Sequence, residues 1–135
     1  MANLPKCIET FQRGWHKKDS NLIREAITDD MVYVDPFGRY EGADQMLKYC
    51  ASSFRRFRDI DLEFTRSACT GELVGLEWSM GLTGDVKGIE GKRVELVGAG
   101  MLELRDGKIR SWHDYWDSVQ MAKQLGIPNV HELRG

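Results

Sequence analysis

The sequence predicts an α+β domain in which helices pack on one face of a curved, mainly antiparallel sheet. Apolar residues recur at helical spacing through most of the first 57 residues, and they alternate at strand spacing through most of the second half. No linker, internal repeat or low-complexity segment divides the chain. Its 135 residues are enough for one sizeable core, so we expect a single domain over residues 1–135.

The first predicted helix is Leu4–Lys17. Its apolar residues recur at steps of three and four and form one stripe, made by Leu4, Ile8, Phe11 and Trp15. Phe11 and Trp15 are either plain core or the floor of a pocket, because helical spacing alone does not separate these two interpretations.

Two further helices are expected. Asp19 or Ser20 caps a short helix that continues through Ile27, and Asp29-Asp30 interrupts it. Gly42–Phe57 is the third helix, with inward-facing Met46, Leu47, Cys50 and Phe54. Three cations lie at its C-terminal end, where they complement the helix dipole: Arg55, Arg56 and Arg58. They are either solvated or a phosphate-binding site.

The strands are predicted from alternating apolar and polar residues. They are Met31–Asp35, Asp61–Cys69, Leu73–Thr83, Lys92–Arg105 and the run that follows Asp106-Gly107. Gly98 and Gly100 share a face of the long fourth strand, which indicates a bend or room for another group to approach. A short helix over Ser118–Leu125 closes the pattern.

The last strand is the most informative stretch. Asp106-Gly107 is typical of a tight hairpin turn, and the strand after it places Trp112, Asp114 and Trp116 on one face. The other face carries His113, Tyr115 and Asp117. If the tryptophan face is buried, Asp114 is a carboxylate held between two indoles, where an unpaired charge is costly. The alternative interpretation leaves Asp114 in solvent.

A curved sheet of this kind closes a cone around an internal pocket. The positions expected to face inward are Tyr33, Asp35, Trp78, Met80, Leu96, Gly98, Gly100, Trp112, Asp114 and Trp116. They are mostly apolar and aromatic, with two carboxylates and one phenol. Such a pocket is suited to a small, largely apolar organic ligand and to acid/base chemistry on it.

Composition and charge exclude several other classes. The net charge of −2 argues against nucleic acid as a partner, and no apolar run approaches the roughly 18 residues of a membrane span. Met1–Lys6 lacks the apolar segment of a signal peptide. The cysteines and histidines show neither disulfide nor metal-ligand spacing: Cys7, Cys50, Cys69, His16, His113 and His131. We therefore expect a cytoplasmic protein without metal or disulfide.

Three segments carry a resemblance to known families. Gly107–Asp117 resembles the corresponding segment of limonene-epoxide hydrolases, and Leu133–Gly135 is similar to the C-terminal end of those enzymes. Asp29–Gly38 resembles the segment that bears the general base of ketosteroid isomerases. Nearly the whole chain resembles the nuclear-transport-factor-2-like superfamily, which includes both families and the SnoaL-like polyketide cyclases.

The resemblance implies a cystatin-like α+β barrel with an internal pocket, no cofactor, and a homodimer formed through the outer face of the sheet. Outward positions on that face are Glu77, Ser79, Val97, Met101 and Tyr115.

Residue by residue, the hydrolase resemblance places Asp114 at one catalytic aspartate, Tyr33 at the water-holding tyrosine and Asp35 where an asparagine stands. The remaining arginine and aspartate positions fall at Trp78 and Met80. Trp offers no guanidinium fork, and Met neither accepts nor gives a proton. The resemblance therefore does not imply that this chain hydrolyses epoxides by the same mechanism.

The isomerase resemblance places Asp35 at the general base, but the oxyanion donors fall near Phe11 and at Ala99 or Gly100, which have no side-chain donor. The SnoaL-like cyclases fit best. They rely on a single acid/base aspartate that matches Asp114, and the conjugation of their substrate stabilises the enolate.

We therefore predict a cofactor-free acid/base enzyme of the cyclase or isomerase type. Asp35 and Asp114 share the proton work, and Tyr33 orients the substrate or a water. Burial and a second carboxylate nearby should raise the pKa of Asp114. The substrate-binding residues are Phe11, Trp15, Trp78, Met80, Leu96, Trp112 and Trp116.

Alternatives remain for the function and for single residues. One is water addition to an epoxide, with Asp35 replacing the missing aspartate, and another is a small-molecule-binding dimer without catalysis. Asp35 precedes a proline, where an Asp often accepts backbone hydrogen bonds in a turn. His16 is expected to be solvated rather than at the pocket mouth, and His113 lies on the face opposite Asp114.

Overall fold

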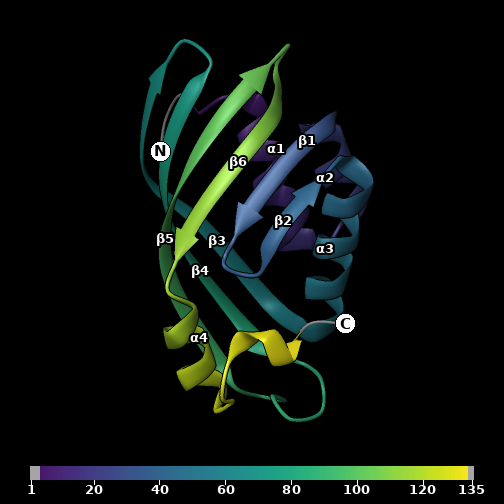
Figure 1. Cartoon of the computed structure of the whole chain (residues 1–135), viewed down its shortest axis with the longest axis vertical. Helices are drawn as coiled ribbons and strands as arrows, with labels where there is room; N and C mark the ends of the chain where they lie inside the picture. Colours follow the sequence, from purple (N-terminus) through teal and green to yellow (C-terminus); the bar gives the residue numbers. More distant parts are fainter. Residues whose placement is uncertain (1–3, 134–135) are drawn as a thin grey trace.

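A six-stranded sheet forms the centre of the fold, in a computed structural model that describes residues 4–133 (Figure 1). The strand order is β2-β1-β6-β5-β4-β3, and every neighbouring pair is antiparallel except β1 and β6, which are parallel. The strands are β1 Ile27–Asp35, β2 Gly38–Glu41, β3 Phe57–Thr70, β4 Leu73–Gly84, β5 Arg93–Arg105 and β6 Lys108–Trp116. The helices are α1 Lys6–Lys17, α2 Ser20–Ala26, α3 Ala43–Arg56, α4 Ser118–Leu125 and the 3-10 helix η1 Val130–Leu133.

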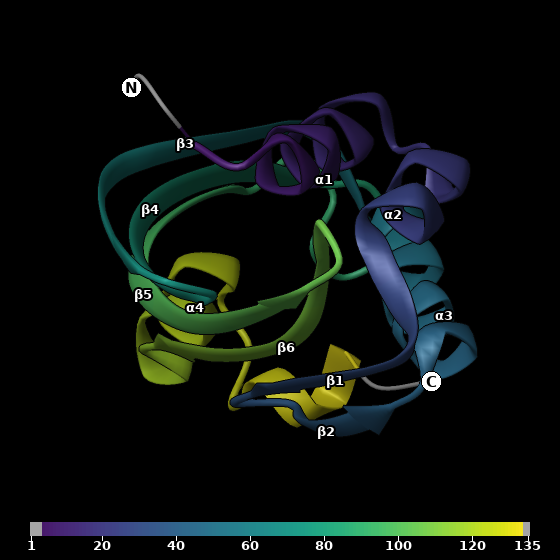
Figure 2. The same cartoon turned by 90° about the horizontal axis from the view of Figure 1, so that it is seen from above.

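The sheet is strongly curved and stays open. Figure 2 shows strands β3 to β6 bending around an interior, which α1 covers on one side and α3 on another. This arrangement confirms the expected α+β class, with N-terminal helices held inside a curved and mainly antiparallel sheet. Within residues 4–133, no helix combines the length and the apolar character that a membrane span requires.

The amphipathic helices pack as their spacing predicts. Ile8, Phe11 and Trp15 of α1 are buried, and the ring of Phe11 lies 4.7 Å from that of Trp112 in β6. The Asp19 carboxylate accepts hydrogen bonds from the first backbone N–H groups of α2, as an N-cap does. The apolar stripes therefore direct α1 and α3 onto the concave face of the sheet.

The turn between β5 and β6 forms as expected, because Asp106 and Gly107 both have positive φ angles, of 52° and 77°. Such a two-residue turn keeps the twist of the flanking strands. Beyond a register shift between Glu103 and Leu104, the pairing of β5 with β6 places Gly100 opposite Asp114 and Leu102 opposite Trp112. The direction of each side chain in this part of β6 therefore matches that of its partner in β5.

The largest differences from the predicted boundaries lie at the starts of β1 and β3. The second helix ends at Ala26, and β1 begins at Ile27 rather than at Met31. Asp29 and Asp30 were expected to interrupt the helix, but they lie inside β1 after the helix has ended. Both side chains are exposed, and Asp30 pairs with Arg105 at 2.6 Å. The short strand β2 is an addition, and β3 starts at residue 57, directly after α3, rather than at residue 61.

Candidate active site

A cavity of about 500 Å³ is lined by residues of the concave face of the sheet and of helices α1 and α3. The structure places all seven predicted substrate-binding residues on its wall: Phe11, Trp15, Trp78, Met80, Leu96, Trp112 and Trp116. Tyr33 and Asp114 also line it. The wall is therefore mainly aromatic and aliphatic, and it contains all four tryptophans of the chain.

Strand alternation brings Asp114 into this cavity. Trp112 and Trp116 lie on the same face of β6 and line the cavity, while Tyr115 on the other face is 64% exposed. The buried-tryptophan interpretation of β6 therefore agrees with the structure, and the solvent-facing alternative for Asp114 does not.

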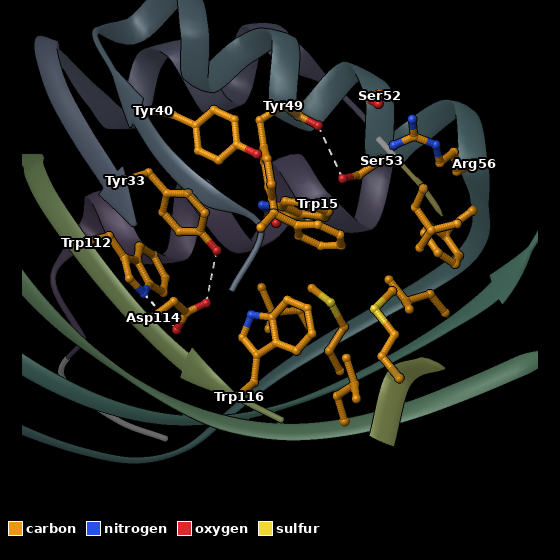
Figure 3. Close-up of a pocket in the computed structure, with 18 of the residues that line it drawn as sticks. Trp15, Tyr33, Tyr40, Tyr49, Ser52, Ser53, Arg56, Trp112, Asp114 and Trp116 are labelled. Carbon is orange, nitrogen blue, oxygen red and sulfur yellow. Dashed lines mark hydrogen bonds between the residues drawn. The ribbon is translucent and has the colours of Figure 1, made fainter. Parts of the chain in front are cut away.

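Three donors hold the Asp114 carboxylate, and two of them, Trp112 and Tyr33, are labelled in Figure 3. Its Oδ1 accepts the indole N–H of Trp78 at 2.8 Å and that of Trp112 at 3.1 Å, and its Oδ2 lies 3.1 Å from the Tyr33 hydroxyl. Burial raises the pKa of Asp114 from 3.8 to about 6, and the negative charge of Asp35 also raises it. The three donors lower this pKa, but burial has the larger effect. Near neutral pH the carboxyl can therefore give or take a proton.

Asp35 lies behind Tyr33 rather than on the cavity wall. Its Oδ2 accepts the Tyr49 hydroxyl at 2.6 Å and lies 3.2 Å from that of Tyr33, and its Oδ1 accepts the Phe37 N–H at 2.8 Å. Burial raises the pKa of Asp35, while these donors lower it. The structure thus supplies the turn hydrogen bond expected for an Asp before proline. Among residues 4–133, hydrogen bonds of the Tyr33 hydroxyl connect Asp35 to Asp114.

The Tyr33 hydroxyl bridges the two carboxyl groups with a single proton. It can donate that proton to Asp114 or to Asp35, but not to both. When Asp114 is protonated on Oδ2, it can donate to the Tyr33 oxygen while Tyr33 donates to Asp35. The network therefore has a satisfied arrangement for protonated Asp114, and Asp35 supplies the acceptor that this arrangement needs.

The histidines lie outside the site. His16 Nε2 lies within 3.0 Å of the backbone nitrogen and oxygen of Leu62, and it does not line the cavity. His16, Asp61 and Glu63 bring potential metal-ligand atoms within 4.8 Å of one another on the exposed surface. Because the Leu62 backbone already engages the histidine nitrogen, this cluster is not a ready-made metal site.

Comparison with known proteins identifies the family. The SnoaL-like domain model matches residues 8–112. The chain belongs to this family. The epoxide hydrolase EphG of Mycobacterium tuberculosis is 28% identical over 122 residues, which are 87% of this chain and 76% of that protein. Leu133–Gly135, whose resemblance to epoxide hydrolases was noted above, lies outside the match, and its last two residues lie outside the described residues.

Solved structures agree with this assignment. An M. tuberculosis epoxide hydrolase of the limonene-epoxide-hydrolase-like type has a TM-score of 0.73 and 25% identity, covering 90% of this chain and 87% of its own. A Catenulispora acidiphila protein with a ketosteroid isomerase-like fold, solved with trimethylamine, has a TM-score of 0.81 and 23% identity, covering 93% and 96%. The second comparison supports the fold alone.

Sequence reasoning missed one whole side of this SnoaL-like cavity. Polar and aromatic residues of α3 line it, and of these only Arg56 was considered from the sequence, as part of a phosphate site: Gln45, Lys48, Tyr49, Ser52, Ser53 and Arg56. Their three- and four-residue spacing was visible in the sequence, next to the apolar stripe that was assigned to the core. Tyr49 is the most important of them, because its hydroxyl holds Asp35.

Replacing Trp78 by Phe tests how the indoles control Asp114. We expect the pKa of Asp114 to rise further, by about one unit, because the variant loses a donor that favours the ionised form. A carbon-13 NMR titration of the side-chain carboxyls measures this change. Trp15→Phe is the matched control, since Trp15 lines the same cavity and packs on Phe54. An unchanged Asp114 pKa in Trp78→Phe would contradict the donor role.

Proposed function

We propose that this SnoaL-like protein is an acid/base enzyme that moves a proton on a small, largely apolar, cyclic or conjugated substrate, as cyclases and isomerases do. The observation that carries the proposal is Asp114, a carboxyl with its pKa raised to about 6 on the wall of an aromatic cavity. A general acid or base works best when its pKa lies near the working pH. Tyr33 and the surrounding indoles keep this group in one position.

In the proposed step, ionised Asp114 removes a proton from a carbon next to a carbonyl group. The electron pair moves into the conjugated system of the substrate, which carries the negative charge. Protonated Asp114 then returns the proton to another carbon, or the carbanion attacks a second carbonyl in the same molecule and takes the proton on oxygen. Tyr33 accepts a hydrogen bond from protonated Asp114, and Asp35 accepts from Tyr33.

Isomerisation of cyclohex-3-en-1-one in deuterated water tests this proposal. We expect conversion to the conjugated enone, followed by ultraviolet absorbance, with deuterium entering the product. The rate should rise with pH through about 6 and then level off, because ionised Asp114 is the base. A rate that is unchanged across this range, or one equal to the rate without protein, would contradict the proposal.

Epoxide hydrolysis is the second candidate, because EphG is 28% identical to this chain. It needs an acid for the epoxide oxygen and a base for water. Among the described residues that line the cavity, Asp114 is the only acidic side chain, so Asp35 would have to act through Tyr33. Cyclohexene oxide in water enriched in heavy oxygen tests this candidate. Formation of a diol that contains the heavy oxygen would favour epoxide hydrolysis over proton transfer.

Two further expectations remain proposals. A protein that only binds its ligand would return it unchanged and would bind it equally well after Asp114→Asn. A homodimer through the outer face of the sheet agrees with the exposure of Val97, Met101 and Tyr115 there.

A further inference from the structure

A polar face of α3 forms the side of the cavity that lies away from Asp114. Lys48, Ser52 and Arg56 follow one another at four-residue steps, so they lie along one face of the helix, and all three line the cavity. Figure 3 shows Ser52, Ser53 and Arg56 together on α3, at the opposite end of the cavity from Asp114. The cavity therefore has an acid/base end and a cationic end.

The helix dipole alone does not explain Arg56. Arg55 and Arg56 both occupy the last turn of α3, where a cation is favourable, but Arg55 is exposed and Arg56 is half-buried on the cavity wall. Burial lowers the pKa of Arg56, and the charge of Arg55 lowers it as well. An interaction with Tyr40 acts in the opposite direction, so the structure places a guanidinium on the cavity wall in a partly buried position.

Positively charged side chains outnumber negatively charged ones on the cavity wall. Arg39, Lys48 and Arg56 line the cavity, and Asp114 is the only acidic side chain among the described residues that do so. Arg39 pairs with Glu41 at 2.7 Å. Asp114 is held by indoles and Tyr33 at the other end. An anionic group would therefore be attracted to Arg56, at the opposite end of the cavity from the Asp114 carboxylate, with Lys48 as a second cation on the wall.

We propose that Arg56, with Lys48 and Ser52, forms a subsite for the carboxylate of a cyclic or conjugated organic acid. A planar carboxylate matches the guanidinium fork, and the serine hydroxyl is a further donor. The apolar body of the acid then lies against the aromatic wall, with its far end toward Asp114. This inference narrows the substrate class of the proposed function. The role of Asp114 rests on the proposed function, whereas the binding of the acid does not.

Isothermal titration calorimetry with three probes of one shape tests the subsite. The probes are cinnamate, its neutral isostere cinnamamide, and styrylphosphonate. We expect cinnamate to bind about tenfold more tightly than cinnamamide, since a charge-assisted hydrogen bond contributes about this factor. Arg56→Gln should remove the preference, and Arg56→Lys should restore part of it. Arg55→Gln, the neighbouring cation outside the cavity, should leave the preference unchanged.

Three results would overturn the subsite. They are equal or undetectable binding of cinnamate and cinnamamide to the wild-type protein, an equal loss in Arg55→Gln and Arg56→Gln, and a tenfold preference for styrylphosphonate over cinnamate. Asp114→Asn separates this proposal from the proposed function, because the variant should keep the carboxylate preference whether or not the wild-type protein is an enzyme. Loss of the preference in Asp114→Asn would also count against the subsite.

Discussion

Asp114→Asn is expected to reduce the proton-transfer rate by about 10²- to 10⁴-fold, the usual contribution of a positioned acid or base. The amide preserves the shape of the side chain. Its oxygen can accept the Trp78 and Trp112 N–H groups, and its NH₂ can donate to the Tyr33 oxygen as protonated Asp114 does. The variant therefore loses the titratable proton and keeps the contacts. Enone formation measures the loss, and Asp44→Asn, an exposed carboxylate outside the cavity, should retain full activity.

The same variant is expected to be more stable than the wild-type protein at pH 7. A pKa raised from 3.8 to about 6 corresponds to at most about 3 kcal/mol by which the fold disfavours ionised Asp114. Because the folded protein binds this proton more tightly than the unfolded chain, the stabilisation by Asp114 is complete below about pH 4. It is lost as the pH rises through about 6.

Urea denaturation of both proteins across this range measures the difference in free energy of unfolding. The advantage of Asp114→Asn should grow between about pH 4 and 6 and stay constant above. An advantage that does not change with pH would show that Asp114 is not the titrating group. A variant that is less stable at every pH would show that the amide does not fit between the indoles and Tyr33.

Asp114 illustrates what the sequence could predict. Side-chain alternation in β6 needs only the local chain, so the shared face of Trp112, Asp114 and Trp116 follows from the sequence and agrees with the structure. The side chain that holds Asp35 does not follow in this way. Tyr49 comes from α3, and only the packing of α3 on the sheet decides whether its polar face meets solvent or the cavity.

The position of Asp35 behind Tyr33 is a second feature that the sequence could not predict. Tyr33 and Asp35 share a face of β1, as predicted, and both are buried. The rings of Tyr33 and Tyr49 are 5.2 Å apart, and the hydroxyl groups of both lie within hydrogen-bond distance of the Asp35 carboxylate. No pattern in a single strand indicates which of two buried residues lines a cavity. Strand β2 was missed for a related reason, because its four residues lack apolar alternation and gain their structure by pairing with β1.

Gly100→Ala is expected to destabilise the fold by about 1–3 kcal/mol, because the added methyl group overpacks the tryptophan wall. A Cβ at this position would lie 2.3 Å from Trp112 Nε1 and 3.0 Å from Asp114 Oδ1. The glycines of β5 therefore provide the room that the sequence indicated. Gly98 has the same role for Trp78, whose ring would lie 2.3 Å from a Cβ there.

Gly100→Ala should also change the pH dependence of activity. Displacing the Trp112 indole removes a donor from Asp114, so the pKa of this carboxyl should rise and the pH at which activity appears should rise with it. Urea denaturation measures the first effect, and the pH dependence of enone formation measures the second. A variant with wild-type stability and an unchanged pH profile would mean that the indole has space to move.

Gly75→Ala is the matched control for this close approach. Gly75 lies in β4 of the same sheet, and the nearest atom to a Cβ there is the Ala68 carbonyl oxygen at 4.0 Å. Alanine restricts the unfolded chain more than glycine does, so this variant should be equal to the wild type or up to about 1 kcal/mol more stable. If both substitutions destabilise the fold equally, the cause lies in the backbone of the strands. If only Gly100→Ala destabilises it, the cause is the close packing of the Trp112 indole beside Asp114.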